Sequence, residues 1–198
     1  MKVKHLVGAF LCVLGCYACS SPKTEVQSPD GHIKMTLTVD ENGKPFYNVS
    51  VDDSLLIENS AMGFTAANGI ILGEGFQVKN TTFSSEDETW TQPWGENKKN
   101  RNHYNEMAVN LTNEDHVQLT LRFRVFDDGI GFRYEYTVPT VDSLLITDEL
   151  TTFRFHRDGT SWSIPASAET YELLYQQQPI SEVKQSVFSR CANIVQTY

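Results

Sequence analysis

The residues best suited to binding chemistry lie together in one polar and aromatic stretch near the middle of the chain. Trp90, Trp94, Arg101, His103 and Tyr104 fall within fifteen residues. Aromatic faces stack on pyranose rings, and a planar guanidinium group donates hydrogen bonds to sugar hydroxyls. The stretch therefore predicts a carbohydrate-contact surface. The competing interpretation is a long structured crossover whose tryptophans close one end of a β-sandwich, because large aromatic side chains are most often buried.

Histidine chemistry is a weaker prediction. His103 has Asn102 and Tyr104 as neighbours, and a single histidine in such a setting also suits a hydrogen-bonded packing residue. No two histidines of the sequence have the spacing of metal ligands. We therefore keep His103 as a sugar-contact candidate and predict no histidine metal site.

Residues 1–19 predict a lipoprotein-type signal peptide, followed by a linker over 20–27. Two lysines precede an apolar segment, 6–15, of ten residues, which is too short to span a bilayer. Cys16 and Cys19 each follow a small residue, as in a bacterial lipobox, and the polar linker favours Cys19 for lipidation. We expect an exported protein of the periplasm or outer membrane, attached to a membrane only through a lipid anchor. An ordinary cleaved signal with incidental cysteines is the alternative.

Charge and cysteine content exclude several classes of protein. Removing the leader takes away Lys2, Lys4 and no acidic residue, which leaves 14 basic against 25 acidic residues and a net charge of −11. A nucleic-acid-binding protein needs the opposite sign. Apart from the anchor, Cys191 is the one cysteine left, so neither a disulfide framework nor a cysteine metal site is expected.

The elements that must position the binding residues are predicted to be antiparallel strands. Apolar and polar residues alternate in four segments that pair as two hairpins across turns rich in Asp, Asn and Gly, 33–39 with 47–51 and 117–125 with 132–138. Shorter apolar pieces lie between residues 55 and 78, and no helical period is evident before residue 165. This pattern predicts an all-β, antiparallel sandwich.

Several motifs resemble one known family. Trp94-Gly95-Glu96, Arg101–Glu106 and the segment Phe126–Tyr134 are similar to the N-terminal domain of glycoside hydrolase family 97, as are Ser28-Pro29-Asp30-Gly31 and Trp162. The similarity covers residues 28–183. It implies a galactose-mutarotase-like β-super-sandwich, and it implies relatives that are exported α-glucosidases and α-galactosidases of Bacteroidetes.

The resemblance also implies a missing partner. Members of the family carry their catalytic carboxylates on a (β/α)₈ barrel that follows the sandwich, and the substrate is an oligosaccharide with α-linked glucose or galactose. Glycoside hydrolysis needs two placed carboxyl groups. We expect Asp127-Asp128 to lie in a turn and Glu86-Asp87-Glu88 in a solvated loop, so neither replaces the pair. The expected product is a fragment of a glycoside hydrolase without catalytic residues of its own.

One metal ligand is implied by the same resemblance. In the family, a glutamate near the end of this domain reaches the barrel and binds a calcium ion beside the substrate, and Glu172 falls on that position. Calcium takes six to eight oxygen ligands, so the remaining ligands would come from the barrel and the site is incomplete in this chain. The alternative is a surface glutamate at a strand end.

The tail, 184–198, departs from the pattern of the family. A frameshift or premature stop would explain this departure, and the sandwich would then lack its last strands.

The sequence leaves two functions from different classes. The first is the N-terminal, carbohydrate-binding-type domain of an exported α-glycosidase. The second is a free-standing carbohydrate-binding lipoprotein of the envelope.

Overall fold

The computed structural model describes residues 24–67, 70–139, 141–165 and 172–183. The predicted leader with Cys16 and Cys19, residues 20–23 and the tail 184–198 lie outside the described residues. Within the described ranges the chain forms thirteen β-strands and one short 3₁₀ helix, with no α-helix.

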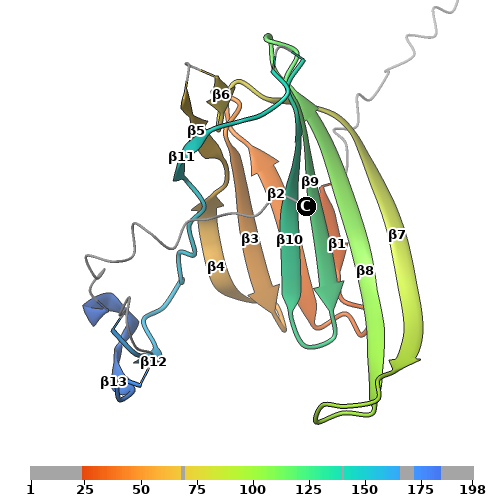
Figure 1. Ribbon diagram of the computed structural model, residues 1–198, viewed down its shortest axis with the longest axis vertical. Helices are drawn as coiled ribbons and strands as arrows, with labels where there is room; N and C mark the ends of the chain where they lie inside the picture. The colour runs from red at the N-terminus through yellow and green to blue at the C-terminus, as the bar shows by residue number, and fades with distance from the viewer. Residues whose placement is uncertain (1–23, 68–69, 140, 166–171, 184–198) are drawn as a thin grey trace, which may run out of the picture.

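Two four-stranded antiparallel sheets make up the body of the molecule. The first has the order β1-β2-β3-β4, with β1 Glu25–Gln27, β2 Ile33–Val39, β3 Pro45–Val51 and β4 Ser54–Ala61. The second has the order β10-β9-β8-β7, with β7 Gln77–Thr91, β8 Lys99–Thr112, β9 Gln118–Phe126 and β10 Ile130–Thr137. The sheets face each other as two layers (Figure 1), with β1 against β8 and β2 against β9. The predicted antiparallel β-super-sandwich is confirmed.

Smaller sheets flank the sandwich. One has the order β11-β5-β6, built from β5 Phe64–Ala66, β6 Ile71–Leu72 and β11 Ile146–Glu149. The other is a hairpin of β12 Thr160–Ser163 and β13 Gln176–Pro179, followed by the 3₁₀ helix η2 Ile180–Glu182. In Figure 1 this hairpin stands apart from the two main sheets.

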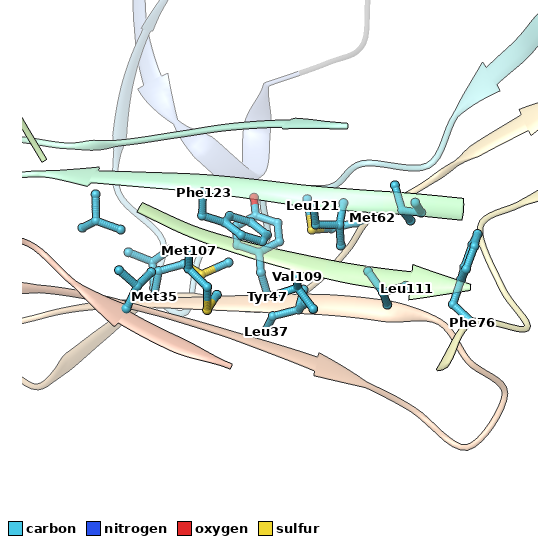
Figure 2. Close-up of a cluster of buried hydrophobic side chains, with 14 of the residues drawn as sticks. Met35, Leu37, Tyr47, Met62, Phe76, Met107, Val109, Leu111, Leu121 and Phe123 are labelled. Carbon is cyan, nitrogen blue, oxygen red and sulfur yellow. The ribbon is translucent and has the colours of Figure 1, made fainter. Parts of the chain in front are cut away.

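The core lies between the two layers because each strand turns alternate side chains inward. Figure 2 shows the interdigitating side chains, which include Met35 and Leu37 of β2, Tyr47 of β3, Met107, Val109 and Leu111 of β8, and Leu121 and Phe123 of β9. All of these are buried. The Tyr47 hydroxyl donates a hydrogen bond of 2.9 Å to the carbonyl oxygen of Thr152, so this polar atom does not lie unpaired in the core.

Both predicted hairpins form. The turn between β2 and β3 contains Gly43, whose φ is +73° and whose missing side chain lets the backbone of Phe76 approach. A Cβ atom at Gly43 would lie 2.3 Å from the Phe76 nitrogen, so no other residue fits. Asp40 Oδ1 fixes the same turn by accepting hydrogen bonds from the backbone N–H groups of Asn42 and Lys44. Asn-Gly was therefore a correct turn signal.

Two segments differ from the sequence prediction. The last residues of the predicted linker form β1, which pairs with residues 34–36 of β2. The stretch around Trp90 is a long hairpin of β7 and β8, where the sequence suggested a crossover and a loop. The apolar alternation is absent there because both faces of this part of the hairpin are polar, so backbone pairing forms the strands without a sequence period to reveal them.

The two sheets differ in what lies along their outer edge strands, β4 and β7. Segment 151–156 runs along β4 and covers its edge through three backbone hydrogen bonds, to Leu56, Glu58 and Ala61. Among the described residues β7 has β8 as its one strand neighbour, and its free edge carries Glu86-Asp87-Glu88. Charged residues on an edge strand oppose pairing with a second chain.

Candidate functional site

The two tryptophans lie at the tip of the β7–β8 hairpin, which extends beyond the neighbouring strands (Figure 1). Trp90 is near the end of β7 and is 50% exposed, and Trp94 is in the connecting turn and is 84% exposed. The Gln92 backbone N–H donates to the Lys98 carbonyl and its side-chain amide donates to the Asn97 carbonyl, so the turn has a defined shape. These are two large aromatic faces open to solvent.

The register of the hairpin separates the five predicted sugar-contact residues. Trp90 pairs with Asn100 and so shares a face of the sheet with Tyr104, whereas Arg101 and His103 occupy the alternate positions of β8. Directly paired residues point to the same side and successive residues to opposite sides. The five residues therefore do not form one surface. Although they are close in the sequence, they lie on two faces of the sheet and in a turn.

Tyr104 is buried, with 7% of its surface exposed. Its ring packs against Phe126 with the ring centroids 5.2 Å apart, and the Arg124 guanidinium lies 4.4 Å from its centroid. Such contacts are typical of a packing residue. Of the three aromatic residues proposed to stack on sugars, the two tryptophans are the exposed ones.

Arg101 is engaged in a bidentate ion pair with Asp87. Its Nε and Nη2 atoms donate hydrogen bonds of 2.7 and 2.8 Å to the two carboxylate oxygens. These hydrogen bonds lower the pKa of Asp87. The pair is exposed on the hairpin and leaves part of the guanidinium fork available to a further acceptor.

His103 belongs to a polar network that joins the two sheets at one end of the sandwich. Its Nδ1 lies 2.7 Å from Asp127 Oδ2, and Asp127 Oδ1 accepts a hydrogen bond from the Asp30 backbone N–H. The Asp30 carboxylate in turn accepts a hydrogen bond from the Ser28 hydroxyl and one from the His32 backbone N–H. These hydrogen bonds lower the pKa of Asp30.

A second tie in the same region comes from Asn105. Its side-chain amide donates to the Gln27 carbonyl of β1 at 2.9 Å and its oxygen accepts from Ser85 of β7 at 2.6 Å. The motifs Ser28-Pro29-Asp30-Gly31, Arg101–Glu106 and Phe126–Tyr134 are thus neighbours in space. The hydrogen bond of His103 to Asp127 is a contact of the kind expected for a packing residue, and the role of His103 as a sugar contact stays a prediction.

Glu172 lies on the exposed segment that leads into β13. The large side chains of Leu174 and Tyr175 next to it and of Trp162 on β12 are all exposed. Within the described residues no three His, Cys, Asp or Glu side chains come together as a metal site.

A chain of ion pairs that the sequence did not predict lies on the outer face of the second sheet, the face turned away from the core. Its members alternate in charge across β8, β9 and β10, in the order Arg124, Glu106, Arg122, Glu135 and Arg133. The alternation of charged with apolar residues in β9 and β10 was visible, but their partners depend on strand register. We refer to these five residues as the ion-pair chain.

Glu106 is the most buried member of the ion-pair chain, with 9% of its side chain exposed. Arg124 Nε donates to its Oε2 at 2.7 Å, and Arg122 Nη1 donates to its Oε1. Burial opposes ionisation of Glu106, but the hydrogen bonds from Arg124 and Arg122 outweigh it, so its pKa is lowered. The carboxylate is therefore charged at neutral pH and fixes both arginines on the sheet.

No helix of the described residues is long and apolar enough to cross a membrane.

Comparison with known proteins relates this architecture to one family. The family model described as Glycosyl-hydrolase 97 N-terminal matches residues 26–196. That range runs past residue 183, where the sequence similarity was expected to end.

Similar proteins agree with this match. A retaining alpha-galactosidase of Bacteroides thetaiotaomicron is 29% identical over 133 residues, which are 67% of this chain and 19% of that protein. The structure of a glycoside hydrolase family 97 enzyme of Pseudoalteromonas sp. strain K8, in complex with panose, superposes with a TM-score of 0.72 at 33% identity and covers 80% of this chain. A beta-arabinopyranosidase structure gives a TM-score of 0.67 at 25% identity, over 77% of this chain.

The chain spans about a fifth of the length of the curated alpha-galactosidase and about a quarter of each of the two solved enzymes. Three observations indicate the same family. They are the match over residues 26–196, the paired antiparallel sheets, and the motifs that the fold brings together at one end of the sandwich. The chain belongs to the family of glycosyl-hydrolase 97 N-terminal domains.

Proposed function

We propose that this chain is the N-terminal, carbohydrate-binding-type domain of an exported α-glycosidase and is catalytically inactive alone. The observation that carries the proposal is the family match over residues 26–196, together with relatives of whose length this chain covers about a fifth to a quarter. Among the relatives are a retaining alpha-galactosidase and an enzyme crystallised with the oligosaccharide panose. These support an oligosaccharide with α-linked glucose or galactose as the substrate of the complete enzyme.

The proposal gives Glu172 a role in the complete enzyme. Its carboxylate would supply one oxygen to a calcium ion beside the substrate, and a (β/α)₈ barrel would supply the other ligands. Leu174 and Tyr175, which follow Glu172 in the chain, and Trp162 on the paired strand β12 are exposed, and this supports the proposal because large apolar residues at the surface are typical of an interface. Lipidation at Cys19 or Cys16 would anchor the exported enzyme in the periplasm or at the outer membrane.

The first test is to read the coding DNA beyond codon 198 in all three frames. We expect a (β/α)₈ barrel with paired carboxylates to follow, in the same frame or a shifted one. The 198-residue chain itself should hydrolyse 4-nitrophenyl α-glucoside and α-galactoside no faster than buffer. A barrel missing from every frame, or hydrolysis by the pure chain, would contradict the proposal.

The polypeptide extended through that barrel then tests Glu172. We expect Glu172→Gln to weaken calcium affinity about tenfold or more, measured by calorimetry, because calcium affinity depends on the charge count of its ligands. Glu182→Gln is the matched control, since Glu182 is an exposed glutamate of the same region. Equal calcium affinity in the two variants would remove Glu172 from the site.

A free-standing carbohydrate-binding lipoprotein of the envelope is the second candidate. The exposure of Trp90 and Trp94 at the hairpin tip favours it, because two open aromatic faces can stack on sugar rings. It requires sugar binding by this chain without a barrel.

This candidate predicts that Trp94→Ala weakens binding of α-linked gluco- or galacto-oligosaccharides at least about tenfold, since a stacked aromatic ring contributes a large share of such a contact. Trp162→Ala is the matched control, as an exposed tryptophan on a different hairpin. Calorimetry on the purified chain measures both. If the wild-type chain binds no oligosaccharide, or if both variants bind equally, the hairpin tip is not a sugar site.

A further inference from the structure

The ion-pair chain on the outer face of the second sheet has more positive than negative members. Three arginines alternate with two glutamates on neighbouring strands, where Arg124 pairs directly with Glu106 and Arg133 directly with Arg122. The five side chains therefore leave one positive charge over, in a chain that is acidic as a whole. The strands of the first sheet that pack on this sheet, β1 against β8 and β2 against β9, lie on its inner face.

The surplus positive charge is concentrated at the two ends of the ion-pair chain. Arg122 in the middle donates to both carboxylates through Nε, Nη1 and Nη2. Arg124 uses Nε for Glu106 and stacks on Tyr104, and among the described residues its Nη groups donate to no acceptor. Arg133 uses Nε and Nη2 for Glu135, which leaves its Nη1 without an acceptor in the same described part of the chain.

A notch separates these two arginines. Gly131 lies directly opposite Arg124 on β10, one outward position before Arg133. Arg124, Gly131 and Arg133 line an open pocket together with Arg122, Phe126 and Phe132. A Cβ atom placed on Gly131 would meet no atom within 4 Å, so the notch is open to a ligand.

The backbone does not explain the glycine. Gly131 is not among the glycines with positive φ, and β10 pairs with β9 without a bulge. A glycine inside a strand otherwise marks a bulge, a tight bend or a place where a ligand approaches closely. The third explanation is the one that the open space and the two flanking guanidinium groups support.

We propose that the notch over Gly131 is a binding site for one oxyanion group, a carboxylate or a sulfate, held between Arg124 and Arg133. Guanidinium N–H groups in a fixed plane match the oxygens of such anions. The neighbouring carboxylates and the Tyr104 ring pre-position both arginines, which reduces the entropy lost on binding. The site goes beyond the proposed function, because it lies apart from Glu172 and the hairpin tip and requires no barrel.

The test titrates the purified chain with sodium sulfate, with glucuronate and with glucose at constant ionic strength, and follows the guanidinium Nε–H signals by NMR. We expect the Arg124 and Arg133 signals to shift and saturate with a dissociation constant on the order of 1–10 mM. Saturation by sulfate alone identifies an inorganic oxyanion as the ligand, and saturation by glucuronate but not glucose identifies a sugar acid.

Two variants test the site from different directions. Arg133→Gln removes one donor and Gly131→Val fills the notch while leaving every charge in place, and each should weaken binding at least about tenfold. Arg154→Gln is the matched control, since Arg154 and Arg133 are 66% and 64% exposed and each pairs with a glutamate. Shifts that do not saturate, that glucose or chloride reproduces, or that both notch variants retain would overturn the proposal.

Discussion

Phe123→Ala should lower the free energy of unfolding by about 3–5 kcal/mol, the usual cost of removing a buried phenylalanine ring. Phe123 lies at the centre of the core on β9, and Phe132 packs near it with the ring centroids 6.0 Å apart. Alanine would leave a cavity between two sheets that are each fixed by their own hydrogen bonds and cannot fully close it. Urea unfolding followed by far-ultraviolet circular dichroism of the strands measures the change.

Phe83→Ala is the matched control for this prediction. Phe83 pairs with Met107, so it lies on the inner face of the same sheet, but it is 51% exposed. The main contacts of the first sheet are with β8 and β9 rather than with β7. Its loss should cost about 1 kcal/mol. Equal costs at the two positions would show that the first sheet covers β7 as well as β9, which would contradict the packing described above.

Glu106→Gln should destabilise the chain by about 2–3 kcal/mol at neutral pH. The change leaves Arg122 and Arg124 without a common counter-charge on a face where the carboxylate is buried. Removing one partner of a fully buried ion pair costs about 3–5 kcal/mol, and the smaller value expected here reflects the partial exposure of both arginines. Glu135→Gln, at the more exposed carboxylate, should cost about 1 kcal/mol or less.

The effect of Glu106 depends on pH in a defined direction. Its pKa in the folded chain is lowered from the ordinary value of 4.5, so ionised Glu106 stabilises the folded state above pH 4.5. This stabilisation is lost as the pH falls through the lowered pKa. The difference in unfolding free energy between the wild type and Glu106→Gln should therefore shrink below pH 4.5. A difference that stays constant down to pH 2 would show that the charge of Glu106 is not responsible.

The sequence by itself determined the fold class and the family. The alternation over 33–39, 47–51, 117–125 and 132–138 predicted strands that the structure contains, and Asn42-Gly43 marked the turn between the first two. These features are local, because a period of two residues and a glycine with positive φ act within a few residues of chain. The motifs that identified the family are also local, because each lies within a single segment of the chain.

The tertiary structure alone decided which side chains meet. Trp90, Arg101 and Tyr104 are close in sequence, yet the hairpin register places Arg101 on the face opposite the other two. Glu106 gave no sign in the sequence of being buried. It is buried because the pairing of β8 with β9 places two arginines over it. Strand register is a long-range property that a local pattern does not contain, and a shift of one residue would reverse every face.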